Sequence, residues 1–255
     1  MWATEGGPGR GVRTWVVERC LTIGARHSAV LDLLGRQITD GTLTEGHVLT
    51  LEHIQEAHGV SRTVARETMR VLESMGLVVS RRRVGITVQP RTEWNVFDPR
   101  VIWWRLAGPG RDAQLRSLTE LRIAVEPFAA AAAARGASAA ERQRVVTLAD
   151  RMRELGEAGE LSEFLELDIE FHDLLLRASG NEMFASLREV VAVVLRGRTQ
   201  LGLMPHRPVP EALDLHEQVA RQVARSEPGS AESAMRELLS EVRAAVVPYG
   251  AGAGE

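Results

Sequence analysis

The sequence contains no lysine, one cysteine and one tyrosine, and aromatic residues make up only 4% of its 255 residues. Because Cys20 is the only cysteine, the chain cannot form an internal disulfide, and a lone thiol is typical of proteins in a reducing compartment. No run of 18 apolar residues is present, so we expect no transmembrane helix and no membrane partner. Residues 1–15 lack the apolar centre of a signal peptide, and we therefore expect a cytoplasmic protein.

All 31 basic residues are arginines, and 44% of the chain is hydrophobic, which is enough for the core of one large domain or two smaller ones. The formal net charge is only −3, but the charges are unevenly distributed. The segment 61–91 carries seven arginines against two glutamates, a local net charge of +5. A basic segment in a mildly acidic chain indicates a polyanionic partner for that segment alone.

The basic segment follows Gly59 and opens with the sequence SRTVARETMR. Gly59 suits a left-handed turn and Ser61 suits a helix N-cap, so the pattern predicts a turn that leads into a helix. On that helix Arg62, Arg66 and Arg70 recur every four residues and share one face. Such a face is either an ordinary solvated surface or the surface that the second helix of a helix-turn-helix places in the major groove of DNA.

The elements around this helix favour the DNA-binding interpretation. Two β-like runs follow the helix and flank an arginine-rich tip, which predicts a basic wing that contacts phosphate or the minor groove. The expected elements are helices at 28–39 and 51–57, a third helix that ends at Gly76, and strands at 47–50, 77–80 and 86–88. The candidate DNA-contacting residues are Ser61, Arg62, Thr63, Arg66, Arg70, Arg81, Arg82, Arg83 and Gly85.

The whole chain is expected to be mainly α, with a winged helix-turn-helix at 26–90 followed by an all-helical bundle at 112–248. Residues 91–111 carry prolines and glycines and predict a linker, whose tryptophans either dock it on a domain surface or form a ligand cage. Residues 1–25 predict a disordered or loosely packed arm, and 249–255 a flexible tail. The bundle helices are expected at 115–135, 139–155, 161–178, 183–201, 210–225 and 230–246.

Three residues of the helical domain form a candidate metal site. Asp168 and His172 are four residues apart and share one helix face beside an apolar stripe, and His216 lies on the apolar stripe of a later helix. A carboxylate and two imidazoles that point inward make a partial shell for a divalent metal such as Zn, Ni or Mn. The alternative is a neutral hydrogen-bonded pair of Asp and His with a purely structural role.

Other polar residues are candidates for binding a small carboxylate effector. Arg122 suits this role because a guanidinium binds a carboxylate through two hydrogen bonds, but it can instead pair with Glu126 one helical turn later. Asn181 either lines a pocket or caps a helix. The weaker candidates, for which exposure at the surface is the default, are Arg196, Arg198 and His206.

Two parts of the sequence resemble the two halves of a known family of regulators. The pattern SRTxxRExxRxLxxxGLV, from Ser61 to Val78, resembles the winged-helix core of GntR-family bacterial transcription regulators. The resemblance covers residues 26–247. Within it, the segment from Trp94 to Trp104 is similar to that of regulators of sugar-acid catabolism, such as galactonate- and gluconate-responsive repressors. The motifs ELR at Glu120, EP at Glu126, DxxxH at Asp168 and ASGN at Ala178 resemble the helical FCD ligand-binding domain of the FadR-type branch.

The resemblance implies a homodimer that binds a short inverted repeat of double-stranded DNA, with Arg62 and Arg66 contacting the operator. It also implies a metal site of one Asp and three His. The position that matches the fourth ligand lies near Leu238, so the set is incomplete in this chain. At the start of the second helix many relatives carry an arginine where this chain has Glu52, so its operator preference need not follow the commonest one.

These observations predict a sequence-specific transcriptional regulator and no enzyme, namely a repressor released when a small carboxylate such as a sugar acid binds the helical domain. Two alternatives stay open. One is a metal-dependent hydrolase that uses the pocket of Asp168, His172 and His216, although the sequence has no HExxH or GxSxG motif. The other is a regulator that senses acyl chains, against which a pocket lined by Asp and His argues.

Overall fold

The computed structural model of the protein describes the backbone of residues 28–202 and 207–246 and the side-chain environments within these ranges up to residue 241. The chain divides between Val96 and Phe97 into two compact units. The arm expected at 1–25, the tail expected at 249–255 and His206 lie outside the described residues. No helix within the described residues is long and apolar enough to cross a lipid bilayer.

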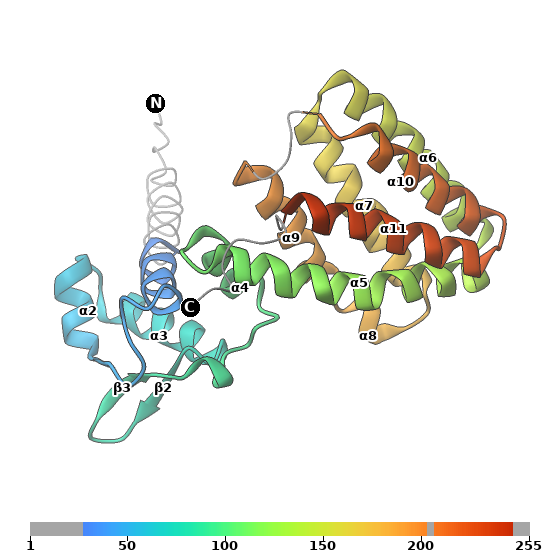
Figure 1. Cartoon of the computed structure of the whole chain (residues 1–255). Helices are drawn as coiled ribbons and strands as arrows, with labels where there is room; N and C mark the ends of the chain where they lie inside the picture. The colour runs from blue at the N-terminus through green and yellow to red at the C-terminus, as the bar shows by residue number, and fades with distance from the viewer. Residues whose placement is uncertain (1–27, 203–206, 247–255) are drawn as a thin grey trace, which may run out of the picture. The chain divides into compact units, whose positions relative to one another are not determined.

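The first unit has the winged helix-turn-helix order that the sequence predicts (Figure 1). After the helix at 28–39, a three-stranded antiparallel sheet of order β1-β3-β2 forms one side of the unit. Val48 of β1 faces Thr87 of β3, and Val78 of β2 faces Val88 of β3. The elements are β1 (Val48–Leu49), α2 (Leu51–His58), α3 (Arg62–Ser74), β2 (Val78–Arg81) and β3 (Gly85–Val88).

Local signals in the sequence set the helix boundaries of this unit. The hydroxyl of Thr50 accepts a hydrogen bond from the backbone N–H of His53 and caps α2. Gly59 ends α2 in the left-handed region with a φ of 60°, and the hydroxyl of Ser61 caps α3. These predictions are confirmed, so the turn between the two helices follows directly from the sequence.

Gly76 ends the α3 segment and allows a close approach that no other residue permits. Its φ is 71°, and a Cβ added there would lie 2.1 Å from the backbone oxygen of Glu93. The segment after the sheet therefore lies against the end of α3, where the backbone N–H of Asn95 donates to the oxygen of Met75 and the indole of Trp94 is buried.

The expected linker at 91–111 contains regular structure, which corrects the prediction. Residues Arg91–Glu93 form a short 3-10 helix, η1, and Pro99–Ala107 form the helix α4, which belongs to the second unit. Asp98 caps α4 and Pro99 opens it, so the proline that predicted a linker is instead part of a helix start signal. Inside the second unit, the buried side chains of α4 pack with those of later helices: Ile102, Leu106, Leu115, Leu118, Val190 and Val194.

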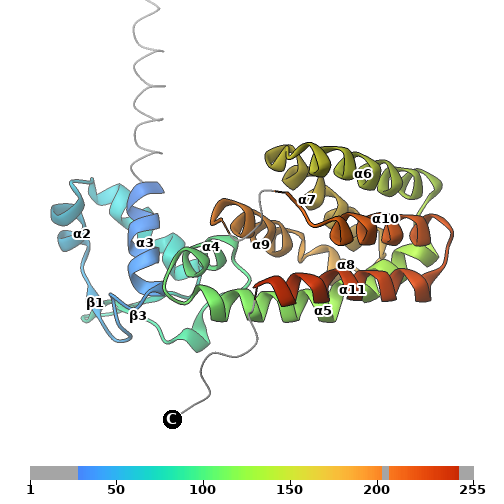
Figure 2. The same ribbon diagram turned by 45° about the horizontal axis from the view of Figure 1, so that its top comes forward.

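The second unit is a helical bundle, as predicted (Figures 1 and 2). Both views show α5 and α11 side by side along much of their lengths, with α10 next to α11 and α6 next to α10. The alanine run of α5 permits this close packing, because small side chains let helix backbones approach. The remaining helices are α5 (Arg111–Gly136), α6 (Ala139–Ala158), α7 (Leu161–Ala178), α8 (Glu182–Ala185), α9 (Arg188–Gln200), α10 (Pro210–Ala224) and α11 (Pro228–Val246).

The single helix predicted at 183–201 is wrong, because the structure divides it into α8 and α9. Ser186 ends α8, and its hydroxyl donates to the backbone oxygen of Met183. A serine that bonds its own backbone in this way competes with helix continuation. After the break, α9 runs in a direction of its own and packs against α7 and α4.

Candidate DNA-binding face and effector pocket

Helix α3 has one buried and one exposed face. Its buried face holds Val64, Ala65, Thr68, Met69 and Leu72, so the arginines that alternate with them must face solvent. The exposed residues of the helix are Arg62, Thr63, Arg66, Glu67, Arg70, Glu73 and Ser74.

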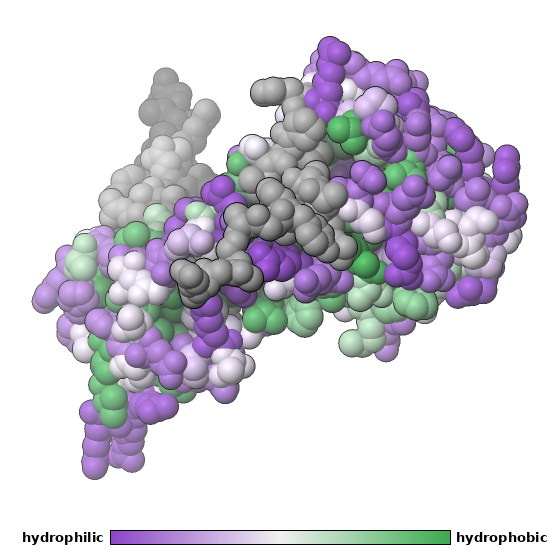
Figure 3. Space-filling view, in the orientation of Figure 1, coloured by the Kyte–Doolittle hydropathy of each residue, from purple (hydrophilic) through white to green (hydrophobic). Residues whose placement is uncertain are grey.

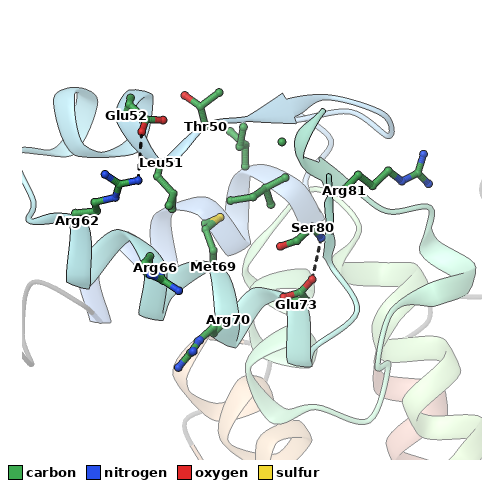
Figure 4. A pocket seen from close by; sticks show the side chains of 13 residues that line it. Thr50, Leu51, Glu52, Arg62, Arg66, Met69, Arg70, Glu73, Ser80 and Arg81 are labelled. Carbon is green, nitrogen blue, oxygen red and sulfur yellow. Dashed lines mark hydrogen bonds and ion pairs between the residues drawn. The ribbon is translucent and has the colours of Figure 1, made fainter. Parts of the chain in front are cut away.

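An open groove of about 630 Å³ lies between α2, α3 and the wing, which is the hairpin of β2 and β3. Figure 4 shows Arg62, Arg66 and Arg70 following one another along α3, with Glu52 of α2 facing Arg62. The groove is open, and four arginines against two glutamates give its lining a net positive charge, which suits a duplex edge better than an enclosed small molecule. Its lining consists of Leu49, Thr50, Leu51, Glu52, Arg62, Arg66, Met69, Arg70, Glu73, Ser80, Arg81, Gly85 and Ile86.

The arginines of α3 differ in their partners. Nη2 of Arg62 lies 3.9 Å from Oε1 of Glu52, and Nη1 of Arg70 lies 3.3 Å from Oε1 of Glu67. Within the part of the chain that the structure describes, Arg66 has neither an ion pair nor a hydrogen bond. Exposed pairs of this kind contribute little to stability, so all three guanidinium groups are available to an incoming anion.

The wing carries three exposed arginines, Arg81, Arg82 and Arg83, and its tip is strongly hydrophilic (Figure 3). Arg83 has a φ of 66°, which places this turn residue in the left-handed region. The wing is fixed to the end of α3, because the carboxylate of Glu73 accepts a hydrogen bond of 2.8 Å from the backbone N–H of Ser80. This role of Glu73 is not apparent from the sequence alone.

Two of the candidate DNA-contacting residues, Gly85 and Ser61, have structural roles, of which only the N-cap role of Ser61 was predicted from the sequence. Gly85 has a φ of 117°, and a Cβ at this position would lie 3.0 Å from Cγ1 of Val48, so glycine is required for the close pairing of β1 and β3. The hydroxyl of Ser61 is occupied as the N-cap of α3. Both residues position the arginines around them.

The second unit encloses a cluster of charged and polar side chains in its core. They come from α5, α7, α9 and α10, which are far apart in the sequence, and each is at most 7% exposed. Burying so many charges is costly unless they compensate one another, so such clusters are either structural networks or binding sites. The members of this buried cluster, the candidate effector pocket, are Arg122, Glu126, Asp168, His172, Arg198 and His216.

The predicted metal-ligating residues do meet inside this cluster. Nε2 of His172 and Nε2 of His216 lie 3.3 Å and 3.2 Å from the same oxygen, Oδ1 of Asp168. Ligand atoms bound at about 2.0–2.1 Å to a tetrahedral Zn²⁺ lie about 3.3–3.4 Å apart, so these spacings match the edges of such a site. Among the described residues, these three form the set of potential ligands whose donor atoms converge.

Neighbouring groups orient both imidazoles. Nδ1 of His216 lies 2.6 Å from the backbone oxygen of Ala212, so Nδ1 carries a proton and Nε2 is the atom that a metal would use. Oε2 of Glu126 lies 2.5 Å from Nδ1 of His172. The contact is electrostatic, since Nδ1 of His172 has no hydrogen-bond partner among the described residues. The donor set therefore fits a divalent cation.

Arg122 lies beside the same atoms. Its Nε donates to Oε1 of Glu126 over 2.6 Å, and its Nη2 lies 3.2 Å from Nε2 of His172. Both interpretations of Arg122 thus have support: it is paired with Glu126, as the structural alternative requires, and it is also part of the pocket. Leu238, which stands near the expected fourth ligand position, is buried in the apolar core.

Known proteins share both halves of this architecture. The model of the bacterial regulatory proteins of the gntR family matches residues 26–88, and that of the FCD domain matches residues 117–241. The HTH-type transcriptional regulator YieP of Escherichia coli (strain K12) is 28% identical over 207 residues, which cover 81% of this chain and 89% of YieP. The galactonate operon transcriptional repressor of the same organism is 26% identical over 211 residues, which cover 81% and 90% of the two chains.

The chain belongs to the GntR family and carries an FCD domain. It is a DNA-binding transcriptional regulator, as the sequence predicts. The solved structure of E. coli McbR/YncC has the same fold, with a TM-score of 0.50 and 16% identity over 87% of this chain and 96% of that chain.

The ionisation of the FCD pocket follows from its close contacts. Burial by itself raises the pKa of Glu126, but Arg122 and His172 outweigh it and lower the pKa to about 2. Burial likewise opposes ionisation of Asp168, and its hydrogen bonds to His172 and His216 lower its pKa below the ordinary value. Both carboxylates are therefore charged at neutral pH.

Burial also changes the pKa values of the basic residues in this cluster. Burial lowers the pKa of His172, but the neighbouring carboxylates, Glu126 first, outweigh it and raise the pKa above its ordinary value. Burial and the charge of Arg122 lower the pKa of Arg198 to about 10, so Arg198 stays protonated at neutral pH. The expectation that Arg198 lies at the surface is wrong, because the residue is 7% exposed.

The structure does not bring Asn181 and Arg196 into this pocket. Asn181 is exposed and caps α8 by accepting a hydrogen bond of 2.9 Å from the backbone N–H of Met183. Arg196 lies in a separate surface groove of about 410 Å³ between α7 and α9, with Nη2 3.7 Å from Oε2 of Glu166. Glu126, treated in the sequence only as a partner of Arg122, is instead a central member of the pocket.

Proposed function

We propose that this regulator is a repressor, released from its operator when a small carboxylate binds the FCD pocket. The observation that carries the proposal is a buried cluster in which Arg122, Arg198 and His172 meet the carboxylates of Glu126 and Asp168. With His172 protonated or a divalent cation present, positive charge exceeds negative charge there. An excess of buried positive charge favours an anion that enters with its own hydrogen-bond acceptors.

At the DNA, we propose that α3 enters the major groove and that Arg62 and Arg66 contact base edges. Arg70 and the three arginines of the wing would contact phosphates and contribute affinity that falls with salt. Two copies of the chain would bind an inverted repeat, since one α3 reads only a few base pairs and a dimer reads two half-sites at a fixed spacing. Such a regulator acts where the chromosome lies, so we propose the cytoplasm as its compartment.

In the pocket, the residues that would hold a metal are Asp168, His172 and His216. A bound divalent cation would supply positive charge to which an effector carboxylate is attracted. Arg122 would bind the same carboxylate through its planar guanidinium, which suits two parallel hydrogen bonds. Because the set has three protein ligands, we expect weaker metal retention than in a site with four.

A sugar acid is the effector class that this pocket suits best. Its hydroxyl groups match the polar side chains of the cluster, whereas an acyl chain would leave buried charges without partners. The galactonate operon repressor, one of the relatives above, supports the same class. The hydrolase alternative would need a free general base, but the carboxylate of Glu126 is already engaged by both Arg122 and His172.

Release requires that the effector bind one arrangement of the dimer more tightly than the other. Half-sites on DNA have a fixed spacing, so a small change in the separation of the two α3 helices is enough to lose the operator. The effector therefore need not touch the DNA-binding unit to act on it.

Fluorescence anisotropy with DNA from upstream of the regulator's own gene tests this proposal. The titration would use that DNA and a scrambled duplex, at two salt concentrations, with and without a panel of sugar acids. We expect salt-sensitive binding that prefers the upstream DNA and is reversed by one acid. Equal, weak binding to both duplexes in the presence and absence of every acid would contradict the proposal.

A further inference from the structure

An acidic side chain lies among the arginines of the DNA-binding groove. Glu52, the second residue of α2, lines the same groove as Arg62, Arg66, Arg70 and Arg81. Its side chain is 66% exposed and faces Arg62 across the groove (Figure 4). A carboxylate repels DNA phosphates, so its presence on this surface reduces general affinity and requires an explanation.

The simplest explanation is the helix dipole. Glu52 lies in the first turn of α2, where a negative charge is favourable because the N–H groups at a helix start carry partial positive charge. However, this effect is local to α2 and does not depend on the DNA sequence. It also predicts that a neutral side chain of the same shape leaves the operator preference unchanged.

The other carboxylates of the groove region have close partners. Oε1 of Glu73 accepts a 2.8 Å hydrogen bond from the backbone of the wing, and Glu67 lies 3.3 Å from Arg70. Among the described residues, Glu52 has only the 3.9 Å contact with Arg62, and both side chains are about two-thirds exposed. A pair this long and exposed opens easily, so Glu52 is the acid that remains available to a donor on DNA.

The major groove offers a suitable donor. Glutamate accepts a hydrogen bond from the N4 amino group of cytosine, and arginine donates two hydrogen bonds to O6 and N7 of guanine. Glu52 and Arg62 are neighbouring groups of opposite sign at the entrance of the same groove. Together they complement a guanine and an adjacent cytosine, whereas the carboxylate of Glu52 repels a phosphate.

We propose that Glu52 is a specificity-determining residue, which accepts a hydrogen bond from N4 of a cytosine beside the guanine that Arg62 contacts. This inference rests on the proposed placement of α3 in the major groove. A guanine or thymine at this position presents only acceptors to the carboxylate, and adenine presents its N6 donor beside the N7 acceptor, so each of these bases binds more weakly than cytosine. Glu52 therefore increases the difference in affinity between the operator and non-specific DNA in two ways. It stabilises the complex with the operator and destabilises the complexes with other DNA.

The test compares the full-length regulator with Glu52→Gln, which keeps the size of the side chain and removes its charge. Each protein selects its preferred sites from a randomised duplex library, and anisotropy then measures every single-base variant of the selected operator. Wild type is expected to lose about 5- to 100-fold in affinity when the cytosine is replaced. In Glu52→Gln the preference should shift from cytosine toward adenine, since an amide pairs with N6 and N7 of adenine.

Two further variants make the outcome unambiguous. Glu67→Gln removes a charge from the exposed face of α3 but should leave the base preference as in wild type. Arg62→Ala tests the placement of α3 itself. If Arg62→Ala binds the operator as well as wild type does, the proposed DNA-binding face is wrong. The proposed role of Glu52, which depends on that face, is then wrong as well.

A different result would overturn the inference alone. If Arg62→Ala loses operator preference while Glu52→Gln keeps the cytosine preference and binds all DNA more tightly, Glu52 acts only through its charge. The role at the helix start would then be its whole function.

Discussion

Arg66 in the first unit and Arg122 in the second show how differently the two units use the same side chain. Arg66 is exposed, and among the described residues it has no ion pair or hydrogen bond, whereas Arg122 is 3% exposed and pairs with Glu126 beside His172. The exposed arginine is available to a large polyanion and costs nothing to keep solvated. The buried arginine lies in the packed interior of its unit, so it can bind only an anion that is small enough to fit there.

The difference predicts that similar substitutions have opposite consequences in the two units. Loss of an exposed arginine should weaken DNA binding without affecting folding. Loss of a buried arginine should destabilise the FCD domain and remove the effector response while the DNA-binding unit stays intact.

The largest effect is expected in the stability of Arg122→Ala. Removing the guanidinium leaves the carboxylate of Glu126 buried without its closest partner, which costs about 3–5 kcal/mol in comparable buried pairs. The matched variant Arg66→Ala should change the free energy of unfolding by less than about 0.5 kcal/mol. Denaturant unfolding followed by circular dichroism measures both, and equal stabilities of the two variants would refute the contrast.

The next effect concerns operator recognition. Arg62→Ala should lose about 1–3 kcal/mol of binding free energy at the operator and relax the base preference at one position of each half-site. Its affinity for scrambled DNA should change much less. Anisotropy titrations with both duplexes give the ratio of the two affinities, and an unchanged ratio would show that Arg62 does not read bases.

Metal binding should depend on pH in a defined direction. A cation at Asp168, His172 and His216 requires an unprotonated Nε2 on His172, whose pKa is raised above its ordinary value of 6.5. Protons therefore compete on the acid side of that raised pKa, and the Zn²⁺ affinity should fall about tenfold per pH unit there. Competition with a chromogenic chelator from about pH 8 to about pH 6 measures this fall.

His216→Ala provides the control for the metal experiment. It removes one of the three ligands, so its Zn²⁺ affinity should be lower than that of wild type at every pH. A Zn²⁺ affinity that stays constant across the pH range, or that survives in His216→Ala, would place the metal elsewhere on the chain.

The smallest effect is expected for the wing. Arg82→Ala should weaken binding to operator and scrambled DNA by the same factor and should reduce the slope of log K against log salt by about 1. Anisotropy at several salt concentrations gives that slope. A change that is specific to the operator would instead place Arg82 against a base.

Much of the first unit is predictable because its signals are local. Gly59, Ser61 and Thr50 each act on residues within one helical turn, so their roles can be inferred without tertiary information. The linker was misassigned because Asp98 and Pro99 are both a helix start and a typical linker pair, and only the packing of Ile102 and its neighbours decides between them.

The pocket was predictable only in part. Asp168 and His172 share a helix face, and His216 lies on an apolar stripe, so periodicity places all three inward. Arg198 and Glu126 are charged residues for which exposure is the usual expectation. Their burial depends on the meeting of α5, α7 and α9, which no local pattern specifies.

The most direct test of the contrast is to measure effector binding and DNA binding on the same two variants, Arg66→Gln and Arg122→Lys. Arg122→Lys keeps a positive charge beside Glu126, so the domain stays folded, but it removes the planar fork that binds a carboxylate. Isothermal titration with the sugar acid that reverses operator binding in the panel experiment, and anisotropy with the operator, would be run on each. We expect Arg66→Gln to lose operator binding and keep the acid, and Arg122→Lys to keep the operator and lose the acid. If one variant lost both activities or neither, the separation of DNA binding and effector binding between exposed and buried arginines would be contradicted.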